Sequence, residues 1–362
     1  MINRKLISDN KLLAIADKIE ADMPINEEDA LYLLQVDDIN GLGVMANFVK
    51  EKHNGNKVYY TVNMNINYTN ICQLRCPLCA FSRNDCDKDA YVLTLKDIEK
   101  KVKSGLEQGI EEVHIVGGLH KNLEIEFFEE MLRTVKRIDP NLFIVAFTAV
   151  EYDFFSRVND LDVKYVIQRL IDAGLGAIPG GGAEIFSEDI RSWMAPKKIS
   201  GTRWLEIMET AHSLGLKTNA SLLYNHSETN IDIIKHLQRI RLLQYKTNGF
   251  KTFIPLPFHQ KNTNVEKITR TYSGVDTIRL FATIRIYLHN IPHLKALWMY
   301  LGEKMAQVLL DYGVDDFGGT YIQEKIVHSA GAKTNDSGTI NHLKYIIKNA
   351  GKEPVKTKAD YS

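Results

Sequence analysis

The chain has 362 residues, and its 45 Lys and Arg residues balance its 45 Asp and Glu residues, so its formal net charge is zero. This balance gives no reason to expect binding to nucleic acid or to a charged membrane surface. Hydrophobic residues make up 44% of the chain, enough for a packed core, and no apolar run approaches the roughly 18 residues of a membrane span.

Residues 1–55 have the apolar spacing of helices. Leu12, Ile15 and Ile19 recur at helical intervals, and Asn26 stands before a run of acids, as a helix N-cap does. The N-terminal residues lack the apolar centre of a signal peptide. We therefore predict an N-terminal helical cap that packs on the main body.

Alternating strand and helix patterns begin just after residue 57. The predicted strands lie at 58–66, 113–116, 143–147, 175–178, 218–223, 252–256 and 296–300. The predicted helices lie at 94–107, 124–137, 162–172, 202–214, 231–246 and 276–288. Repeated strand–helix units imply an α/β fold with a parallel sheet, here a TIM-like (β/α) barrel over 56–351 that is complete or nearly so. The charged residues 352–362 are expected to form a flexible tail.

Three cysteines, Cys72, Cys76 and Cys79, follow the first predicted strand with the spacing C-x3-C-x2-C. Three thiolates suit a [4Fe–4S] cluster in which one iron keeps an open position. Zinc normally takes four ligands, often as two pairs, and the fourth cysteine, Cys86, lies in a polar stretch without a second pair. The spacing, with Phe81 beside it, resembles the signature of the radical S-adenosylmethionine (SAM) superfamily. An oxygen-sensitive cluster and only four cysteines favour a reducing cytoplasm.

Further unusual residues follow other predicted strands, where barrel enzymes place their active sites. Gly117 and Gly118 let the backbone approach a ligand closely, Glu151 follows the third strand, and three glycines precede Glu184. The glycine run lacks the pattern of a phosphate loop. We expect Glu184 to accept hydrogen bonds from SAM, and Arg191 either to pair with the SAM carboxylate or to form a surface salt bridge.

Among the histidines, those at strand ends are the better candidates for function: His120, His226 and His259. Histidines inside predicted strands or helices are more often structural: His114, His212, His236 and His328. Arg285 begins a cation-rich segment before the last predicted strand. A solvated helix end would explain these cations equally well.

From about residue 40 to 350 the chain resembles aminofutalosine synthase, the radical SAM enzyme of the futalosine route to menaquinone. The resemblance is carried by the cysteine loop and by the runs at 114–120, 147–151, 179–186, 218–224, 253–259 and 315–320. Cyclic dehypoxanthine futalosine synthase and the deazaflavin-forming FO synthases share the cysteine loop and the triple glycine. Lys121, Asn225 and Gln260 depart from the expected pattern, all at loop tips.

The resemblance implies a transferase that adds the 5′-deoxyadenosyl radical of SAM to 3-[(1-carboxyvinyl)oxy]benzoate and forms 6-amino-6-deoxyfutalosine. It implies a [4Fe–4S] cluster on the three cysteines and SAM bound near Phe81, Gly117, Gly118, Glu151, Glu184 and Arg191. His120, His259 and Arg285 are then the candidates for the substrate carboxylates, and flavodoxin or ferredoxin would supply electrons. The alternatives are a related hydrogen-abstracting radical SAM enzyme and a non-catalytic iron–sulfur protein.

Overall fold

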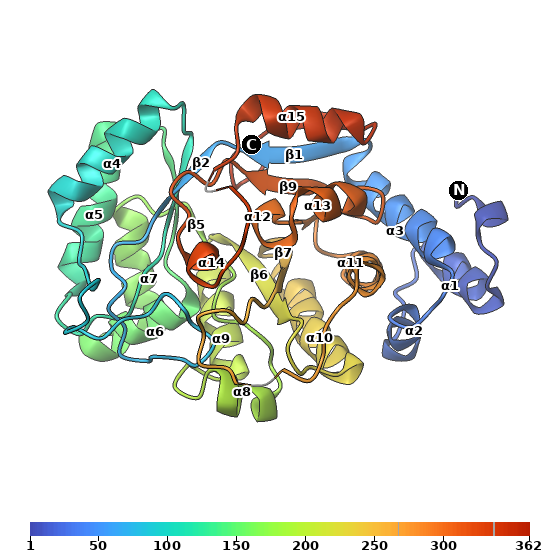
Figure 1. Cartoon of the computed structure of the whole chain (residues 1–362), viewed down its shortest axis with the longest axis horizontal. Coiled ribbons are helices and arrows are strands. Elements are labelled where there is room, and N and C mark those ends of the chain that lie inside the picture. Colours follow the sequence, from blue (N-terminus) through green and yellow to red (C-terminus); the bar gives the residue numbers. More distant parts are fainter. Residues whose placement is uncertain (267, 336) are drawn as a thin grey trace.

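The computed structural model describes residues 1–266, 268–335 and 337–362 and consists of parallel strands wrapped by helices (Figure 1). Seven strands form one sheet in sequence order, each parallel to the next. They are β2 (Asn63–Ile66), β3 (Glu112–Ile115), β4 (Phe143–Ala146), β5 (Ala177–Ile178), β6 (Lys217–Tyr224), β7 (Phe250–Pro257) and β8 (His293–Leu294).

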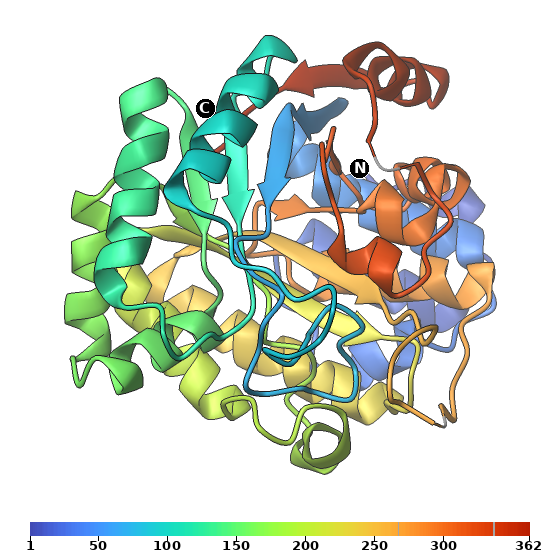
Figure 2. The same ribbon diagram turned by 60° about the vertical axis from the view of Figure 1, so that its left-hand side comes forward.

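Helices between these strands cover the outer face of the curved sheet (Figure 2). They are α4 (Leu95–Glu107), α5 (Ile125–Ile138), α6 (Ala149–Val158), α7 (Val163–Asp172), α8 (Glu188–Met194), α9 (Gly201–Ser213), α10 (Asn230–Thr247) and α11 (Gly274–Tyr287). Capping boxes start several of them; Thr94 and Asp97, for example, bond each other's backbone N–H at the start of α4. All six predicted helices form within a few residues of their expected bounds.

A second parallel sheet closes most of the gap between β8 and β2. It contains β1 (Lys57–Thr61), β9 (Asp316–Gly319) and β10 (Glu353–Lys356) in the order β10-β1-β9. Isolated bridges link Lys295 to Asp316 on one side and Met64 to Ile322 on the other. The predicted nearly complete barrel is therefore confirmed, although the expected strand over 58–66 divides into β1 and β2, which join different sheets.

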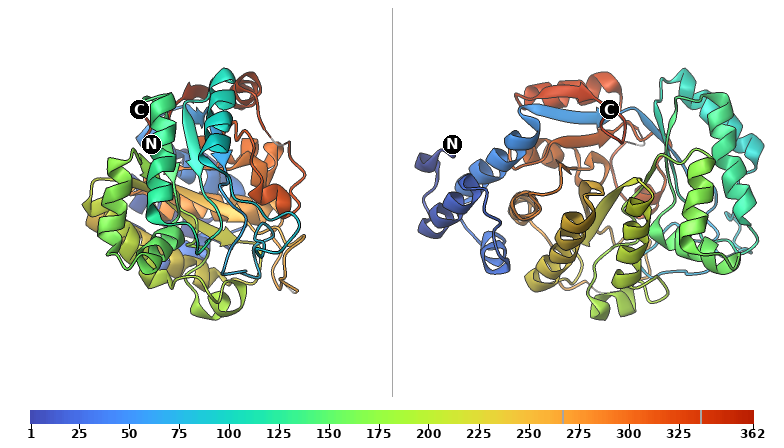
Figure 3. Two further views of the ribbon diagram at one scale, coloured as in Figure 1. Left: turned by 90° about the vertical axis from the view of Figure 1, so that its left-hand side faces the viewer. Right: turned by 180° about the vertical axis from the view of Figure 1, so that it is seen from behind.

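The N-terminal helices lie against one flank of the barrel (Figure 3). They are η1 (Arg4–Leu6), α1 (Asn10–Glu20), α2 (Glu27–Leu33) and α3 (Ile39–Asn54). Helix α3 packs on α11, and α2 packs on α10 and α11. None of the helices among the described residues is long and apolar enough to cross a membrane.

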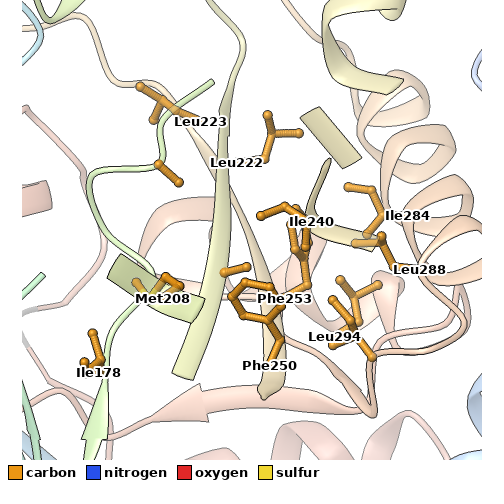
Figure 4. Packing of buried hydrophobic residues seen from close by; sticks show 14 of the residues in the cluster. Ile178, Met208, Leu222, Leu223, Ile240, Phe250, Phe253, Ile284, Leu288 and Leu294 are labelled. Carbon is orange, nitrogen blue, oxygen red and sulfur yellow. The ribbon is translucent and has the colours of Figure 1, made fainter. Parts of the chain in front are cut away.

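The core lies between the sheet and its helices. Phe250 and Phe253 of β7 are buried among Ile240 of α10, Ile284 of α11 and Leu294 of β8 (Figure 4). Removing such aromatic surface from water stabilises the fold by roughly 1.5–3 kcal/mol per side chain. This packing fixes the strand ends that carry the site described below.

The predicted strand at 296–300 is wrong. The last strand, β8, lies earlier, and Trp298–Leu301 form the short helix α12, whose Trp298 donates a hydrogen bond to the Gly319 carbonyl at 2.9 Å. A short apolar run does not distinguish a buried strand from a buried helix, which explains the error. The helices α13 (Glu303–Leu309), α14 (Ile326–Ser329) and α15 (Ile340–Asn349) follow.

The structure also differs from the expected flexible tail over 352–362. Strand β10 pairs with β1, and beyond it Ala359 is buried and the Tyr361 hydroxyl donates to Asp316 at 2.6 Å. Figure 1 shows the C-terminal end in the upper part of the view, beside β1 and below α15. The charges that suggested a tail instead meet partners, as Lys356 meets Glu111.

Candidate active site

The carboxyl ends of the strands surround a cavity of about 390 Å³. Its walls come from the loops after β2, β3, β4, β5 and β7 and from the segment around α14. The lining residues with polar side chains are Asn65, Asn70, Cys72, Cys76, Cys79, Ser82, His114, Thr148, Glu151, Glu184, Lys198, His259, Tyr300, Tyr321 and Glu324.

The cysteine loop after β2 brings Cys72, Cys76 and Cys79 to the wall of this cavity as free thiols. Its two ends are joined by backbone hydrogen bonds between Cys72 and Arg83, at 3.1 Å, and between Arg83 and Asn70, at 2.7 Å. Cys86 is exposed and does not line the cavity. The loop therefore presents three thiols, and not the fourth, to one space.

The glycine pair after β3 lets the chain pass directly behind this loop. A Cβ on Gly118 would lie 2.1 Å from the carbonyl oxygen of Ile71, and one on Gly117 would lie 2.7 Å from the Tyr68 ring. Contacts this close have no room for any side chain. Both glycines line the cavity, so they also leave their backbone open to a ligand.

The thiols suit a cluster better than a single ion. No three His, Cys, Asp or Glu side chains among the described residues are grouped as ligands of one metal ion. A zinc ion would need such a group, because its ligands all bind one centre. In a [4Fe–4S] cluster each cysteine binds a different iron, so the sulfurs are spread around the cube. Burial raises the pKa of Cys76 to about 11, and the nearby Lys198 opposes this rise.

A partly buried ion pair lines the same cavity as the thiols. The Nζ of Lys198 lies 2.5 Å from Oε1 of Glu184, and both side chains line the cavity. Burial alone would raise the pKa of Glu184, but Lys198 holds it below its usual value. Sequence analysis missed Lys198, which follows an exposed lysine in an unremarked loop. The pair offers a carboxylate and an ammonium to one zwitterionic ligand.

Glu151 lines the cavity, but both of its carboxylate oxygens accept hydrogen bonds from neighbouring residues. One accepts hydrogen bonds from the Tyr68 hydroxyl at 2.8 Å and the Gly117 N–H at 3.1 Å. The other accepts from Thr148, whose capping box with Glu151 begins α6. Burial raises the pKa of Glu151, against these hydrogen bonds. Its clearest effect is to position Gly117.

Two predicted arginines do not reach the cavity. Arg191 is buried behind the glycine loop and donates to the carbonyls of Ala183, at 2.7 Å, and Ile185, at 3.1 Å. Arg285 lies at the opposite end of the barrel, where it donates to Asp315 at 2.5 Å and to the Gly313 carbonyl at 2.8 Å. The expectation that Arg285 contacts a ligand in this cavity is contradicted, because these partners bury the guanidinium elsewhere.

The histidines divide differently from the prediction. His259 lines the cavity and donates from Nε2 to the Tyr300 carbonyl at 3.1 Å, whereas His120 and His226 lie outside the lining. Burial lowers the pKa of His259. His114, expected to be structural, lines the cavity from within β3. Its polar neighbour Glu112, two residues earlier on the same strand face, was the sequence signal that could have identified it. Phe81 lines the cavity as expected.

Comparisons with protein families agree with this architecture. Residues 66–240 match the model of the radical SAM superfamily, and residues 247–362 match the CofH/MqnC C-terminal region. Aminodeoxyfutalosine synthase of Thermus thermophilus is 38% identical over 98% of this chain and 96% of its own length. The enzyme of the same name from Streptomyces coelicolor is 33% identical over 96% and 92%. Cyclic dehypoxanthine futalosine synthase of S. coelicolor is 34% identical over 97% and 88%.

Solved structures share the fold at low sequence identity. HydG, a maturase of the [FeFe]-hydrogenase, superposes with a TM-score of 0.78 at 18% identity, covering 99% of this chain and 78% of HydG. Methylornithine synthase (PylB) superposes with a TM-score of 0.75 at 16% identity, covering 94% and 97%. At these identities the likenesses show the fold alone.

Proposed function

Because the chain belongs to the radical SAM family, whose members use a [4Fe–4S] cluster and SAM, we propose that it is an aminodeoxyfutalosine synthase. It would join the 5′-deoxyadenosyl group of SAM to the enolpyruvyl double bond of 3-[(1-carboxyvinyl)oxy]benzoate. Loss of one carboxyl carbon as bicarbonate or CO2 then gives 6-amino-6-deoxyfutalosine. The observation that carries the proposal is the single cavity lined by three free thiols and the Glu184–Lys198 pair.

In this proposal Cys72, Cys76 and Cys79 hold the cluster, and Cys86 does not. A cluster held there would supply the electron for the reductive cleavage of SAM. Three thiolate ligands leave one iron with room for the amino and carboxylate groups of SAM. Cys76 is buried, and exclusion of water around it would protect a reactive species from side reactions.

The remaining site residues would bind and orient SAM. Glu184 is placed to accept from the ammonium or ribose of SAM, and Lys198 takes the role first expected of Arg191, pairing with the SAM carboxylate. Gly117 and Gly118 expose backbone to the same ligand. Phe81 and the apolar residues of the opposite wall, which are Leu223, Leu256, Phe258, Leu297 and Met299, limit the access of water.

The substrate would lie between SAM and the strand ends. His259 is the predicted carboxylate partner that lines the cavity, and its Nδ1 has no hydrogen-bond partner among the described residues. His120 lies outside the lining and Arg285 at the far end of the barrel, so neither is retained. We further propose flavodoxin or ferredoxin as the electron donor and, from the free cysteines, a reducing cytoplasm as the setting.

A second candidate is hydrogen abstraction, as in a cyclic dehypoxanthine futalosine synthase, because a relative of that name covers almost the whole chain. Anaerobic incubation of reconstituted protein with SAM and the enolpyruvyl benzoate separates the two. The proposed reaction attaches the adenosyl group to the substrate. Hydrogen abstraction instead releases 5′-deoxyadenosine and leaves the benzoate unchanged.

A further inference from the structure

The end of the barrel at which the strands begin (the lower end) is partly filled by the chain's own C-terminal residues. Ala359 packs on Val145 of β4 and Ala177 of β5, with Phe143 beside them, as a small apolar cluster apart from the main core. In a (β/α) barrel this space is normally filled by layers of side chains from the strands. Here a returning segment supplies part of that filling.

Polar groups fix this segment through both its backbone and its side chains. The N–H of Ala359 donates to Oε2 of Glu112, and its carbonyl accepts from Lys251. The Tyr361 ring stacks on His293 with centroids 3.5 Å apart, and its hydroxyl donates to Asp316 at 2.6 Å. So many directed contacts distinguish this segment from a terminus that frays.

The strand opposite the segment is adapted to it. The register between β6 and β7 shifts between Thr218 and Asn219, which pair with Phe250 and Thr252, so Lys251 is the extra residue of a bulge. A bulge redirects side chains. Here Lys251 donates a hydrogen bond to the Ala359 carbonyl, and the Thr252 hydroxyl forms a hydrogen bond with the Tyr361 hydroxyl. Burial lowers the pKa of Lys251 to about 8, while Glu112 acts in the opposite direction.

Glu112 connects the segment with the cavity. One of its oxygens accepts from Ala359, and the other meets Nε2 of His114. Burial would raise the pKa of Glu112, but His114, Lys251 and Lys295 hold it below its usual value, so the carboxylate is charged. A buried carboxylate that accepts from one ring nitrogen fixes the orientation of the ring.

His114 has one nitrogen left for a ligand. Its Nε2 meets Glu112, and Nδ1 has no hydrogen-bond partner among the described residues, although the ring lines the cavity. In register beside it, Asn65 also lines the cavity, and its buried Oδ1 lacks a partner among the described residues. His114 lies within β3, three residues before Gly117, which follows the strand, so its backbone lies up to about 10 Å deeper in the barrel at about 3.3 Å per residue.

We propose that residues 357–362 are a positioning element of the active site, which through Glu112 holds His114 so that its Nδ1–H binds a carboxylate of the substrate. The inference rests on the proposed function, since it needs a carboxylate-bearing substrate below SAM. His114 would then be a substrate-binding residue, whereas Glu112 and the segment act only through it. In this arrangement Nε2–H donates to Glu112 and Nδ1–H donates to the substrate.

Hydrogen exchange on the full-length protein tests, without any substitution, whether residues 357–362 are held in place. The Thr357 N–H donates to the Tyr60 carbonyl at 3.0 Å, and the Ala359 N–H donates to Glu112. Both amides are expected to exchange at least about a hundredfold more slowly than a freely exposed amide, like those of the barrel strands. Exchange of both at the rate of a disordered peptide would overturn the inference.

Whether the segment positions His114 is tested by Ala359→Pro, which removes the N–H that donates to Glu112. The matched control is Lys358→Ala, whose side chain makes a 3.4 Å surface contact with the Asn141 carbonyl and no other hydrogen bond among the described residues. For Ala359→Pro we expect iron content and SAM cleavage without substrate to stay within about twofold of wild type. The KM for the enolpyruvyl benzoate should rise about tenfold, the lower end of effects for groups that orient a ligand-binding residue. Lys358→Ala should match wild type.

His114→Ala should give the same rise in KM, and the double variant should be no worse than His114→Ala alone, because both changes break one connection. Additive losses, or a normal KM in either single variant, would contradict the proposal. If Ala359→Pro loses its iron, Glu112→Gln breaks the same link with the backbone unchanged and is judged by the same criteria. A wild-type protein that forms no adduct would refute the proposed function instead, and the exchange result would still decide the role of the segment.

Discussion

Each end of the barrel contains an ion pair, and the two pairs differ in exposure. The upper end is where the strands end, beside the cavity, and the lower end is where they begin. At the upper end Lys198 and Glu184 keep 17% and 14% of their side chains exposed to the cavity. At the lower end Arg285 and Asp315 keep 1% and 0%, and Asp315 also accepts from His293 and the Leu294 N–H. A charged pair that retains unused hydrogen-bonding capacity beside a cavity is suited to bind a ligand. A pair whose donors and acceptors are all occupied maintains the fold.

Loss of a cluster cysteine is the largest effect expected at the upper end. Alanine at Cys72, Cys76 or Cys79 should abolish adduct formation and most bound iron, because each thiolate would hold one iron. Cys86→Ala is the matched control, since Cys86 is exposed and away from the cavity. Iron analysis and product mass spectrometry check both. Loss of iron in Cys86→Ala, with iron retained in an alanine variant of Cys72, Cys76 or Cys79, would contradict the proposed set of cluster ligands.

Breaking the lower pair should affect stability instead of chemistry. Arg285→Leu leaves the Asp315 carboxylate buried without its main partner. Removing one member of a buried pair typically costs about 3–5 kcal/mol of unfolding free energy. Chemical denaturation measures this cost, and the KM for substrate in the folded fraction should change by less than about twofold. A stable Arg285→Leu protein with a raised KM would restore Arg285 to the substrate site and remove the contrast between the two ends.

Removing the charge at the upper end should affect SAM binding more than stability. Lys198→Met keeps the apolar stem but cannot pair with a carboxylate. A hydrogen bond to a charged group is worth about 1.5–3 kcal/mol, so the Kd of SAM should rise roughly 10- to 150-fold. Lys197→Met is the control, because Lys197 is an exposed neighbour on the same loop. Equal SAM affinity in both variants would exclude Lys198 from the site.

The pH dependence of stability gives the smallest effect. Burial would raise the pKa of Asp315, but Arg285 and His293 hold it below its usual value. Since the folded pKa lies below the unfolded one, near 3.9, the unfolded state binds the extra proton. This stabilisation is present above about pH 4 and is lost as pH falls through the folded pKa. Denaturation midpoints between pH 5 and 2.5 should therefore fall less steeply for Asp315→Asn than for wild type. Parallel profiles would contradict this assignment.

Sequence reasoning worked where a local pattern carries the information. The cysteine spacing, the strand–helix alternation and the glycines after β3 all led to elements around one cavity. It misplaced residues whose environment depends on distant chain. The position of the Arg285 guanidinium depends on its ion pair with Asp315, and the sequence near Arg285 does not predict that partner.

The same limit explains the tail and the histidines. The charged composition of residues 352–362 resembles a solvated end, but its partners are distant in sequence. Asp316 lies 45 residues from Tyr361, Glu112 lies 247 residues from Ala359, and β1 lies nearly 300 residues from β10. His114 was set aside because it lies within a strand, although inward-facing strand residues line the interior of a barrel. Alternation of Glu112 and His114 along β3 was the usable signal.

The central claim is that this cavity joins the adenosyl group to an enolpyruvyl benzoate. The most direct test incubates the reconstituted protein anaerobically with dithionite, the benzoate and SAM carrying ¹³C throughout its adenosyl group. Mass spectrometry then follows the label. We expect the labelled adenosyl group in a covalent product with the aryl carbons of the substrate, as 6-amino-6-deoxyfutalosine. Label found only in 5′-deoxyadenosine, with the benzoate unconsumed, would contradict the account.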